Sequence, residues 1–278
     1  MYNILNKRHL APGIIEYKIY APMVVENAKP GQFIILRTDL FGERVPFTIC
    51  DIDKVSGTVT ILVQTIGATT YKLSLMNVGD CLADFVGPLG CATDLTNYER
   101  VLLVGGGIGA AVIYPQCKQL HRNERSVDVI IGARNENLLL YIDEFKSMSK
   151  SLYILTDDGS IGEQGFVTQK INELLKRNKE HDVVFAVGPL PMMRAVCEVT
   201  SKYGVKTIIS MNSIMLDGTG MCGCCRLTVD NKIQYACIHG PEFDGHLVKW
   251  EEAIQRSKQF IQTEKAHYCR IRGITNEN

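Results

Sequence analysis

The chain has 278 residues, of which 46% are hydrophobic and 22% charged, and its formal net charge is zero. This length is enough for two or three domains that each bury a core. With no net positive charge and no long basic run, the composition excludes a nucleic-acid surface and an anionic membrane face. No stretch reaches about 18 uninterrupted apolar residues, and the first residues lack the apolar core of a signal peptide. We therefore expect a soluble, cytoplasmic protein with no membrane segment.

The first part of the chain, residues 1–96, has the pattern of a β domain. Alternating or apolar runs of strand length occur at Ile14–Tyr20, at 31–37 and at Thr58–Gln64. Turn signals separate these runs, among them Pro30-Gly31 and Ser56-Gly57. Several short strands at this spacing predict a small β barrel.

The pattern changes in residues 97–210, where strand-like and helix-like stretches alternate. Strand-like runs lie at 100–104, 126–132, 151–156, 182–188 and 206–210, and helix-like stretches at 110–120, near 143–145, at 168–178 and from 191 onward. This alternation predicts an α/β domain with a doubly wound parallel sheet.

A glycine-rich turn, Gly105-Gly106-Gly107-Ile108-Gly109, stands between the first of these strands and its helix. Glycines in this place let a pyrophosphate approach the helix N-terminus, although the third position of the strict fingerprint falls on Ala110 and a ligand-free turn has the same pattern. Loops at 156–159 and 188–193 follow two further strands, and ligands of open α/β sheets bind at that edge. We predict NAD(P) contacts at Gly105, Gly106, Gly107, Gly109, Arg134, Asp157, Gly188, Pro189 and Met192. Arg134 could face a 2′-phosphate or the diphosphate, which leaves NAD(H) and NADP(H) both open.

Four of the ten cysteines cluster in residues 211–250, namely Cys222, Cys224, Cys225 and Cys237. Thiolates bind iron well, and glycine spacers let the backbone wrap a compact cluster. A structural zinc site is the alternative, but two adjacent cysteines do not easily face one metal, so we favour a 2Fe–2S cluster. Its fourth ligand is either Asp217 or Cys224, and an aspartate before a glycine is also an ordinary turn residue.

Segments of the β domain resemble the FAD-binding barrel of ferredoxin-reductase-like flavoproteins. They are Arg44-Val-Pro46-Phe47-Thr48, 64–73 and 87–90. Taken alone, Arg44 would be a surface ion-pair residue and Thr48 a strand residue, yet a guanidinium also suits phosphate. The resemblance implies FAD contacts at Arg44, Pro46, Phe47, Thr48, Val63, Gln64, Gly67, Thr69 and Thr70.

With the cysteine segment included, about residues 3–250 resemble a narrower group. They are similar to electron-transfer subunits of type B dihydroorotate dehydrogenases, and to small subunits of NADH-dependent ferredoxin:NADP oxidoreductases and of sulfide dehydrogenases. The resemblance implies a 2Fe–2S cluster on Asp217, Cys222, Cys225 and Cys237. An aspartate in the first of these places is typical of the ferredoxin:NADP oxidoreductase branch, which we favour.

The expected function is an NAD(P)H-dependent flavin oxidoreductase subunit. A nicotinamide would give hydride to FAD, and single electrons would leave through the cluster to a partner. No residue is predicted to be a catalytic acid or nucleophile, so we expect the partner to carry the substrate chemistry. The partner would be a larger flavin and iron–sulfur subunit or, in the pyrimidine-synthesis alternative, an FMN-containing dihydroorotate dehydrogenase subunit. A second alternative is a carrier or interaction module with a regulatory nucleotide site. Residues 251–278 are predicted to be a polar, largely helical C-terminal tail.

Overall fold

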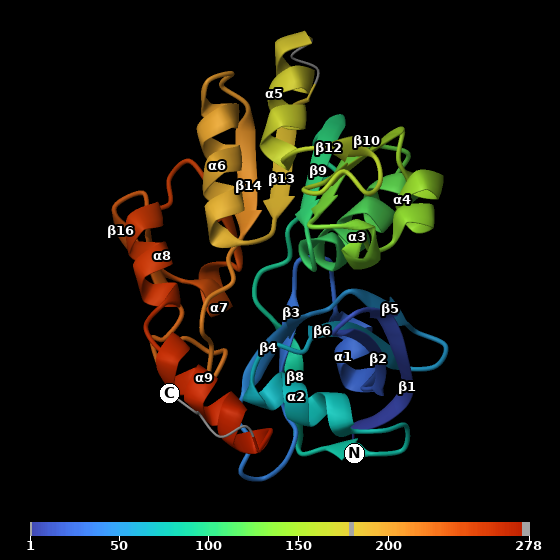
Figure 1. The fold of residues 1–278 in the computed structure, drawn as a ribbon, viewed down its shortest axis with the longest axis vertical. Helices are drawn as coiled ribbons and strands as arrows, with labels where there is room; N and C mark the ends of the chain where they lie inside the picture. The colour runs from blue at the N-terminus through green and yellow to red at the C-terminus, as the bar shows by residue number, and fades with distance from the viewer. Residues whose placement is uncertain (1, 178–180, 274–278) are drawn as a thin grey trace.

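A computed structural model describes residues 2–177 and 181–273 (Figure 1). The N-terminal β domain lies below the edge of a large sheet, and the C-terminal elements run down one side of the molecule back to the β domain. Within the described part, none of the helices combines the length and apolar composition that crossing a membrane requires.

The β domain consists of two antiparallel sheets around one core. Their strand orders are β5-β6-β2-β1-β7 and β4-β3-β8. Tyr17, Ile34 and Phe85, from both sheets, are among its fully buried side chains. This arrangement confirms the predicted β-barrel fold class. The elements are β1 (Tyr2–Ala11), β2 (Ile14–Tyr20), α1 (Pro22–Asn27), β3 (Phe33–Arg37), β4 (Val45–Thr48), β5 (Asp51–Asp53), β6 (Thr58–Gln64), α2 (Ala68–Leu75), β7 (Cys81–Leu82) and β8 (Asp84–Leu89).

The α/β domain is built on a sheet of order β12-β11-β10-β9-β13-β14-β17, in which every neighbouring pair but the last is parallel. Helices α3 and α4 cover one face and α5 and α6 the other, which confirms the doubly wound sheet. The elements are β9 (Arg100–Gly106), α3 (Gly109–Arg122), β10 (Ser126–Ala133), η1 (Glu136–Leu138), α4 (Ile142–Met148), β11 (Ser151–Thr156), β12 (Glu163–Gln164), α5 (Val167–Arg177), β13 (Val183–Val187), α6 (Leu190–Ser201) and β14 (Lys206–Ser210). Residue 178, predicted to end a helix, lies outside the described residues.

The cysteine segment is not separate from this sheet. It contains the hairpin β15 (Arg226–Val229) and β16 (Lys232–Tyr235), the short helix α7 (Ala236–His239) and the strand β17 (Glu242–Asp244). Strand β17 pairs antiparallel with β14 and so completes the sheet of the preceding domain. The predicted boundary at residue 211 therefore does not separate two independent cores.

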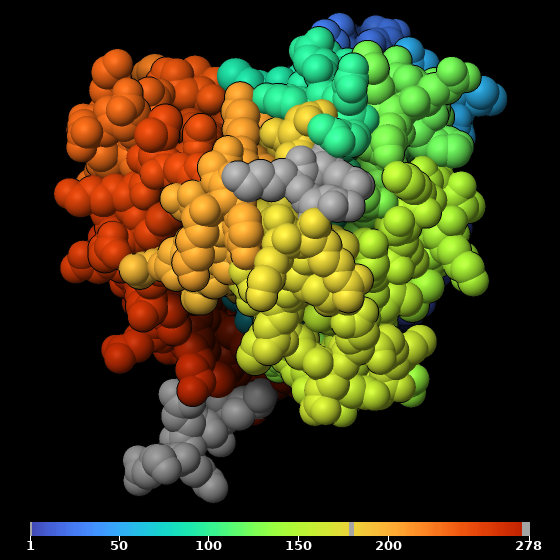
Figure 2. All heavy atoms as spheres, turned by 90° about the horizontal axis from the view of Figure 1, so that it is seen from above, coloured from blue at the N-terminus to red at the C-terminus, as the bar shows by residue number. Residues whose placement is uncertain are grey.

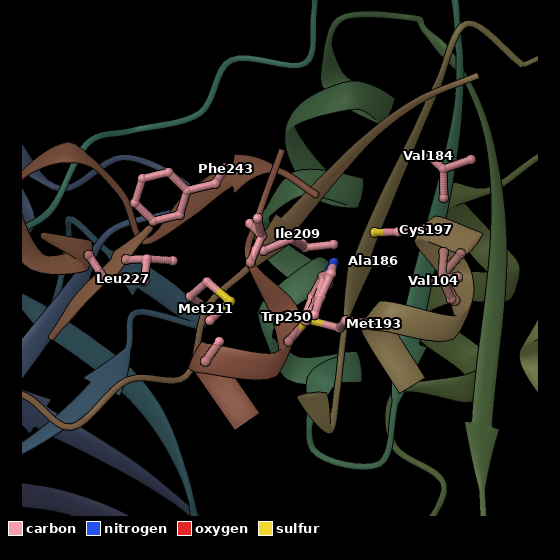
Figure 3. Close-up of a cluster of buried hydrophobic side chains, with 14 of the residues drawn as sticks. Val104, Val184, Ala186, Met193, Cys197, Ile209, Met211, Leu227, Phe243 and Trp250 are labelled. Carbon is pink, nitrogen blue, oxygen red and sulfur yellow. The ribbon is translucent and has the colours of Figure 1, made fainter. Parts of the chain in front are cut away.

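One hydrophobic core continues from the sheet into the cysteine segment (Figure 3). It includes Val104 and Val184 from the sheet, and Leu227, Phe243 and Trp250 from the C-terminal part. The buried indole of Trp250, at the start of α8 (Trp250–Ser257), donates a hydrogen bond to the Gly245 carbonyl at 3.0 Å. The shared core fixes the cysteine segment against the sheet.

The predicted tail forms two helices, and the second, α9 (Ile261–Ile271), packs on α2 of the β domain. The Tyr71 and Tyr268 rings meet edge to face at 5.9 Å, and the Arg272 guanidinium lies 5.5 Å from the Tyr71 ring. His267 Nδ1 lies 3.1 Å from Glu43 Oε1. The helical character was thus predicted, but its return to the β domain was not. In the view from above, the C-terminal part occupies the side opposite the α4 region (Figure 2).

Candidate cofactor cleft and metal centre

A cleft of about 960 Å³ lies between the β domain and the α/β domain. Its walls are strand β4 on one side and, on the other, the turn after β9 and the loops after β10, β11, β13 and β14. These loops follow the carboxyl ends of the parallel strands, where ligands of open α/β sheets bind. The volume lies at the upper end of the range for cofactor sites.

Most of the predicted FAD and NAD(P) residues line this single cleft. From the β domain they are Pro46, Phe47, Thr48, Gln64 and Thr70, and from the α/β domain Gly106, Gly107, Gly109, Arg134, Asp157, Gly188, Pro189 and Met192. The fold thus brings together residues that are up to about 150 positions apart in the sequence.

Three glycines of the turn after β9 have different structural roles. Gly107, which lines the cleft, has a φ of +56°. No atom lies within 4 Å of the position that its Cβ would occupy, so this position is open space. A Cβ on Gly106 would overlap with the Met192 sulfur, and one on Gly109 with the Val187 carbonyl oxygen. The absence of side chains therefore provides room for a ligand at Gly107, and close packing against the Met192 side chain at Gly106 and against the Val187 backbone at Gly109.

Two predicted site residues lie inside the fold. Val63 is fully buried in the β-domain core, so its side chain does not face the cleft. Gly105 packs against Ala110 of α3, where a Cβ would approach the Ala110 Cα to 2.8 Å. Neither residue is part of the cleft lining, and the sequence pattern could not separate such packing positions from ligand contacts.

Three further predicted FAD residues do not line the cleft and instead form hydrogen bonds within the protein. They are Arg44, Gly67 and Thr69. Arg44 Nε donates to the Leu216 carbonyl at 2.7 Å, and its Nη1 lies 3.4 Å from Asp84 Oδ2. The Gly67 amide donates to Thr70 Oγ1, and the Thr69 hydroxyl donates to Glu43 at 3.0 Å. Their phosphate roles stay predictions.

The segment after β14 also lines the cleft, although no site residue was predicted there. The lining residues are Ser210, Met211, Asn212, Ser213 and Met215, together with Pro241. The signal was present, since Ser210 ends a parallel strand like the other loop positions. The clustered cysteines assign residues 211–250 to the metal module, and this assignment obscures the strand-end pattern that precedes them.

The predicted cluster ligands form two close pairs. Cys225 Sγ lies 3.3 Å from Cys237 Sγ, and Cys222 Sγ lies 3.2 Å from Asp217 Oδ1. The loop that carries Asp217, Cys222 and Cys225 has positive φ angles at its glycines, Gly218, Gly220 and Gly223. This left-handed backbone folds the loop tightly on itself.

The two pairs differ in their electrostatics. Burial, with the neighbouring Cys225 sulfur, raises the pKa of the Cys237 thiol, and a bound metal cation would favour its thiolate form. At Asp217, burial would raise the pKa, but hydrogen bonds from Cys222 and Thr219 outweigh it and lower the pKa to about 2. The Asp217 carboxylate is thus an ionised oxygen donor at neutral pH.

This arrangement fits a two-iron cluster better than a single ion. In the part of the chain that the structure describes, no three His, Cys, Asp or Glu side chains converge to hold one metal ion. Tetrahedral zinc needs four donors around one point, whereas a 2Fe–2S cluster can take one pair at each iron. Cys224 Sγ lies in neither pair, and its nearest acceptor is the Cys222 carbonyl at 3.9 Å.

Comparison with known proteins agrees with both sites. Residues 103–198 match the model of the oxidoreductase NAD-binding domain, and residues 212–249 match that of the iron–sulfur cluster binding domain of dihydroorotate dehydrogenase B. A Thermotoga maritima homolog of the dihydroorotate dehydrogenase B (NAD(+)) electron transfer subunit is 41% identical over 275 residues, which cover 99% of this chain and 97% of that protein. The Fusobacterium nucleatum electron transfer subunit of the same enzyme is 33% identical, covering 84% and 92% of the two chains.

A solved structure of NADH-dependent reduced ferredoxin-NADP oxidoreductase contains a chain of the same architecture. It superposes with a TM-score of 0.91 at 40% identity, covering 97% of each chain. Fold, cleft and cysteine loop together define an oxidoreductase of the ferredoxin-reductase class, with an NAD-binding domain and an iron–sulfur domain. More narrowly, the chain belongs to the family of dihydroorotate dehydrogenase B electron transfer subunits and their homologues.

Proposed function

We propose that this protein is the cytoplasmic electron-transfer subunit of a heteromeric oxidoreductase and connects a nicotinamide nucleotide, through FAD and a 2Fe–2S cluster, to a larger catalytic subunit. The observation that carries the proposal is the continuity of the two sites. Met215 lines the cleft two residues before Asp217, and Pro241 lines it four residues after Cys237. The chain therefore enters and leaves the metal centre along the wall of the cofactor cleft.

Specific residues would hold each of the three predicted cofactors, namely FAD, the nicotinamide nucleotide and the cluster. Strand β4, with Pro46, Phe47 and Thr48, would flank the flavin ring, and the turn at Gly106–Gly107 would lie along the nucleotide phosphates. Asp217 and the three paired cysteines would hold the cluster. When bound, FAD would accept a hydride and release electrons singly, and the cluster would carry single electrons onward. The protein's contribution is to orient these groups and to set their electrostatic surroundings.

Two members of the family suggest different partners. The Asp217 position and the likeness to the ferredoxin-NADP oxidoreductase structure favour a larger flavin and iron–sulfur subunit. The similarity to electron transfer subunits of dihydroorotate dehydrogenase B favours a dihydroorotate dehydrogenase subunit as the partner, and hence a role in pyrimidine synthesis. Co-purification of the native complex distinguishes the two, because the bound subunit would carry either additional iron–sulfur clusters or FMN alone.

A reconstitution experiment tests the subunit's own activity. Purified protein loaded with iron, sulfide and FAD is expected to reduce an artificial one-electron acceptor with NADH, and to lose this activity when FAD is left out. Parallel assays with NADPH determine the nucleotide preference. Protein that binds FAD yet shows no turnover with either nucleotide would favour a carrier module with a regulatory nucleotide site.

The Asp217→Cys substitution tests the oxygen ligand. Ligand type and net charge are among the factors that set a cluster's potential, so four thiolates in place of three and a carboxylate are expected to change it. We expect the visible cluster spectrum to be retained and the midpoint potential, measured by redox titration, to shift. Cys224→Ser is the matched control and should leave the potential unchanged. An unchanged potential in Asp217→Cys would show that Asp217 is not a ligand.

A further inference from the structure

A buried carboxyl group without a hydrogen-bond partner lies beside the cleft lining, five residues after the predicted cluster ligand Cys237. Glu242 is the first residue of β17, and both of its carboxylate oxygens are shielded from solvent and lack a partner at normal hydrogen-bond geometry. Buried polar groups are almost always paired, so an unpaired carboxyl group requires an explanation. None of the roles assigned so far uses it.

The carboxyl group is enclosed by elements of different parts of the fold. A Cβ on Gly31, in the β domain, would lie 2.9 Å from Glu242 Oε2, so the backbone there packs directly over the carboxyl group. On β14 the strand partner of Glu242 is Ser210, which lines the cleft. Along the chain, Pro241 also lines the cleft, and Cys237 lies five residues before Glu242. Glu242 is thus next to cleft-lining residues along the chain and across the strand pair, and it follows the predicted cluster ligand Cys237 by five residues.

Burial makes Glu242 a weaker acid than an ordinary glutamate. It raises the pKa of Glu242 to about 7, an effect that the nearby Thr93 hydroxyl partly offsets. Burial thus favours the uncharged carboxylic acid at this position far more than at an exposed glutamate.

The charged residues of the surrounding segments are directed elsewhere. Lys29, beside Gly31, is exposed, and Asp94, beside Thr93, accepts hydrogen bonds from Thr96. On β17 itself, Asp244 accepts from the His246 amide. On α3, Lys118 is paired with Asp51, and on β14, Lys206 lies over the Tyr98 ring. None of these charges contributes to the pKa of Glu242. A new negative charge nearby would therefore raise this pKa without being offset by an existing ion pair.

We propose that Glu242 is a redox-linked proton carrier for the metal centre. When one electron from the reduced nicotinamide, delivered through the flavin, reaches the cluster on Asp217 and the three cysteines, the Glu242 carboxylate takes up one proton from solvent and becomes a carboxylic acid. When the electron leaves, the proton is returned. The physical reason is that added negative charge favours the neutral form of a nearby buried acid. Glu242 acts on the cluster only through its charge and does not bind iron. This inference rests on the proposed function.

The test is the pH dependence of the cluster's midpoint potential in the reconstituted full-length protein. Coupled uptake of one proton lowers the potential as pH rises through about 7, with a slope that approaches about 59 mV per tenfold change in proton concentration. Glu242→Gln is expected to abolish this slope, and Glu264→Gln, an exposed carboxylate on α9, to retain it. Thr93→Val removes the group that lowers the pKa and should move the pH of the transition upward. A slope that persists in Glu242→Gln would overturn the proposal.

A second readout needs no cofactor. Because the folded-state pKa of about 7 lies above the ordinary value of 4.5, the contribution of Glu242 to the apoprotein's unfolding free energy should be fully present below the ordinary value and fall away as pH rises through about 7. Glu242→Gln should remove this fall, and an identical pH profile in both proteins would overturn the buried-acid assignment. A wild-type protein that fails to form the cluster at all would overturn the proposed function, and the inference with it. A flat potential in a wild type with an intact cluster spectrum would overturn the inference alone.

Discussion

Replacing Cys237 with alanine should remove the cluster while leaving NADH-dependent reduction of the flavin intact. Cys237 is 2% exposed, and its sulfur lies 3.3 Å from that of Cys225, so one iron would keep a single protein ligand. Outer-shell substitutions already cost about 10–100-fold in metal affinity or activity, and a lost ligand should cost more than about 100-fold in electron delivery to a one-electron acceptor. Visible absorption and electron paramagnetic resonance measure the cluster, and stopped-flow spectroscopy measures the reduction of the flavin by NADH.

Cys224→Ala is the matched control for this experiment. Cys224 adjoins Cys225 but belongs to neither of the two ligand pairs, so its removal should leave the cluster signal and electron delivery as in the wild type. Loss of the cluster in Cys224→Ala, with a normal cluster in Asp217→Ala, would instead identify Cys224 as the fourth ligand. Slow flavin reduction in Cys237→Ala would show that the cysteine segment also supports the nucleotide site.

The second large effect is expected from Gly109→Ala at the start of α3. A Cβ there would overlap with the backbone carbonyl oxygen of Val187 in β13, which cannot rotate away as a side chain could. Helix and strand must separate, and overpacking of this kind typically costs about 1–3 kcal/mol, with the upper end expected against backbone. We expect the unfolding free energy in urea to fall by about 3 kcal/mol and NADH affinity to fall with it, because the same turn borders the cleft.

Gly204→Ala provides the control for backbone conformation. Gly204 has a φ of +66° and no atom within 4 Å of where a Cβ would be, so only the left-handed conformation is penalised. That penalty is about 1–2 kcal/mol, and nucleotide affinity should not change because Gly204 does not line the cleft. Equal losses of stability in the two variants would contradict the steric argument for Gly109.

The fold class could be predicted because its signals are local. Buried strands such as β9 and β13 are continuous apolar runs, and the glycine turn after β9 marks the strand-to-helix transition. Strand β1 gave no such signal, since half of the residues in Tyr2–Ala11 are polar and its pairing with β2 is irregular. Its place in the sheet comes from pairing with the adjacent strand β2 on one side and with the distant strand β7 on the other.

The candidate site was predicted in part for the same reason. Glycines and strand ends marked the nucleotide side, and the cysteine spacing marked the metal centre. Val63 and Gly105, which were predicted as cofactor contacts, do not line the cleft, and their roles stay predictions. The α9 contact with α2 and the buried carboxyl of Glu242 depend on tertiary packing, which no short sequence window contains.

Strand β17 also limits how this protein can be rearranged by recombination or design. It comes from the cysteine segment but forms the edge of the sheet beside β14. A chimera that exchanged residues 211–250 for another redox module would leave one edge of β14, the edge opposite β13, unpaired, and such bare edges promote aggregation. Exchange is therefore compatible with folding only for modules that bring an edge strand of their own, so the electron exit of this chain is inherited together with part of its nucleotide-binding sheet.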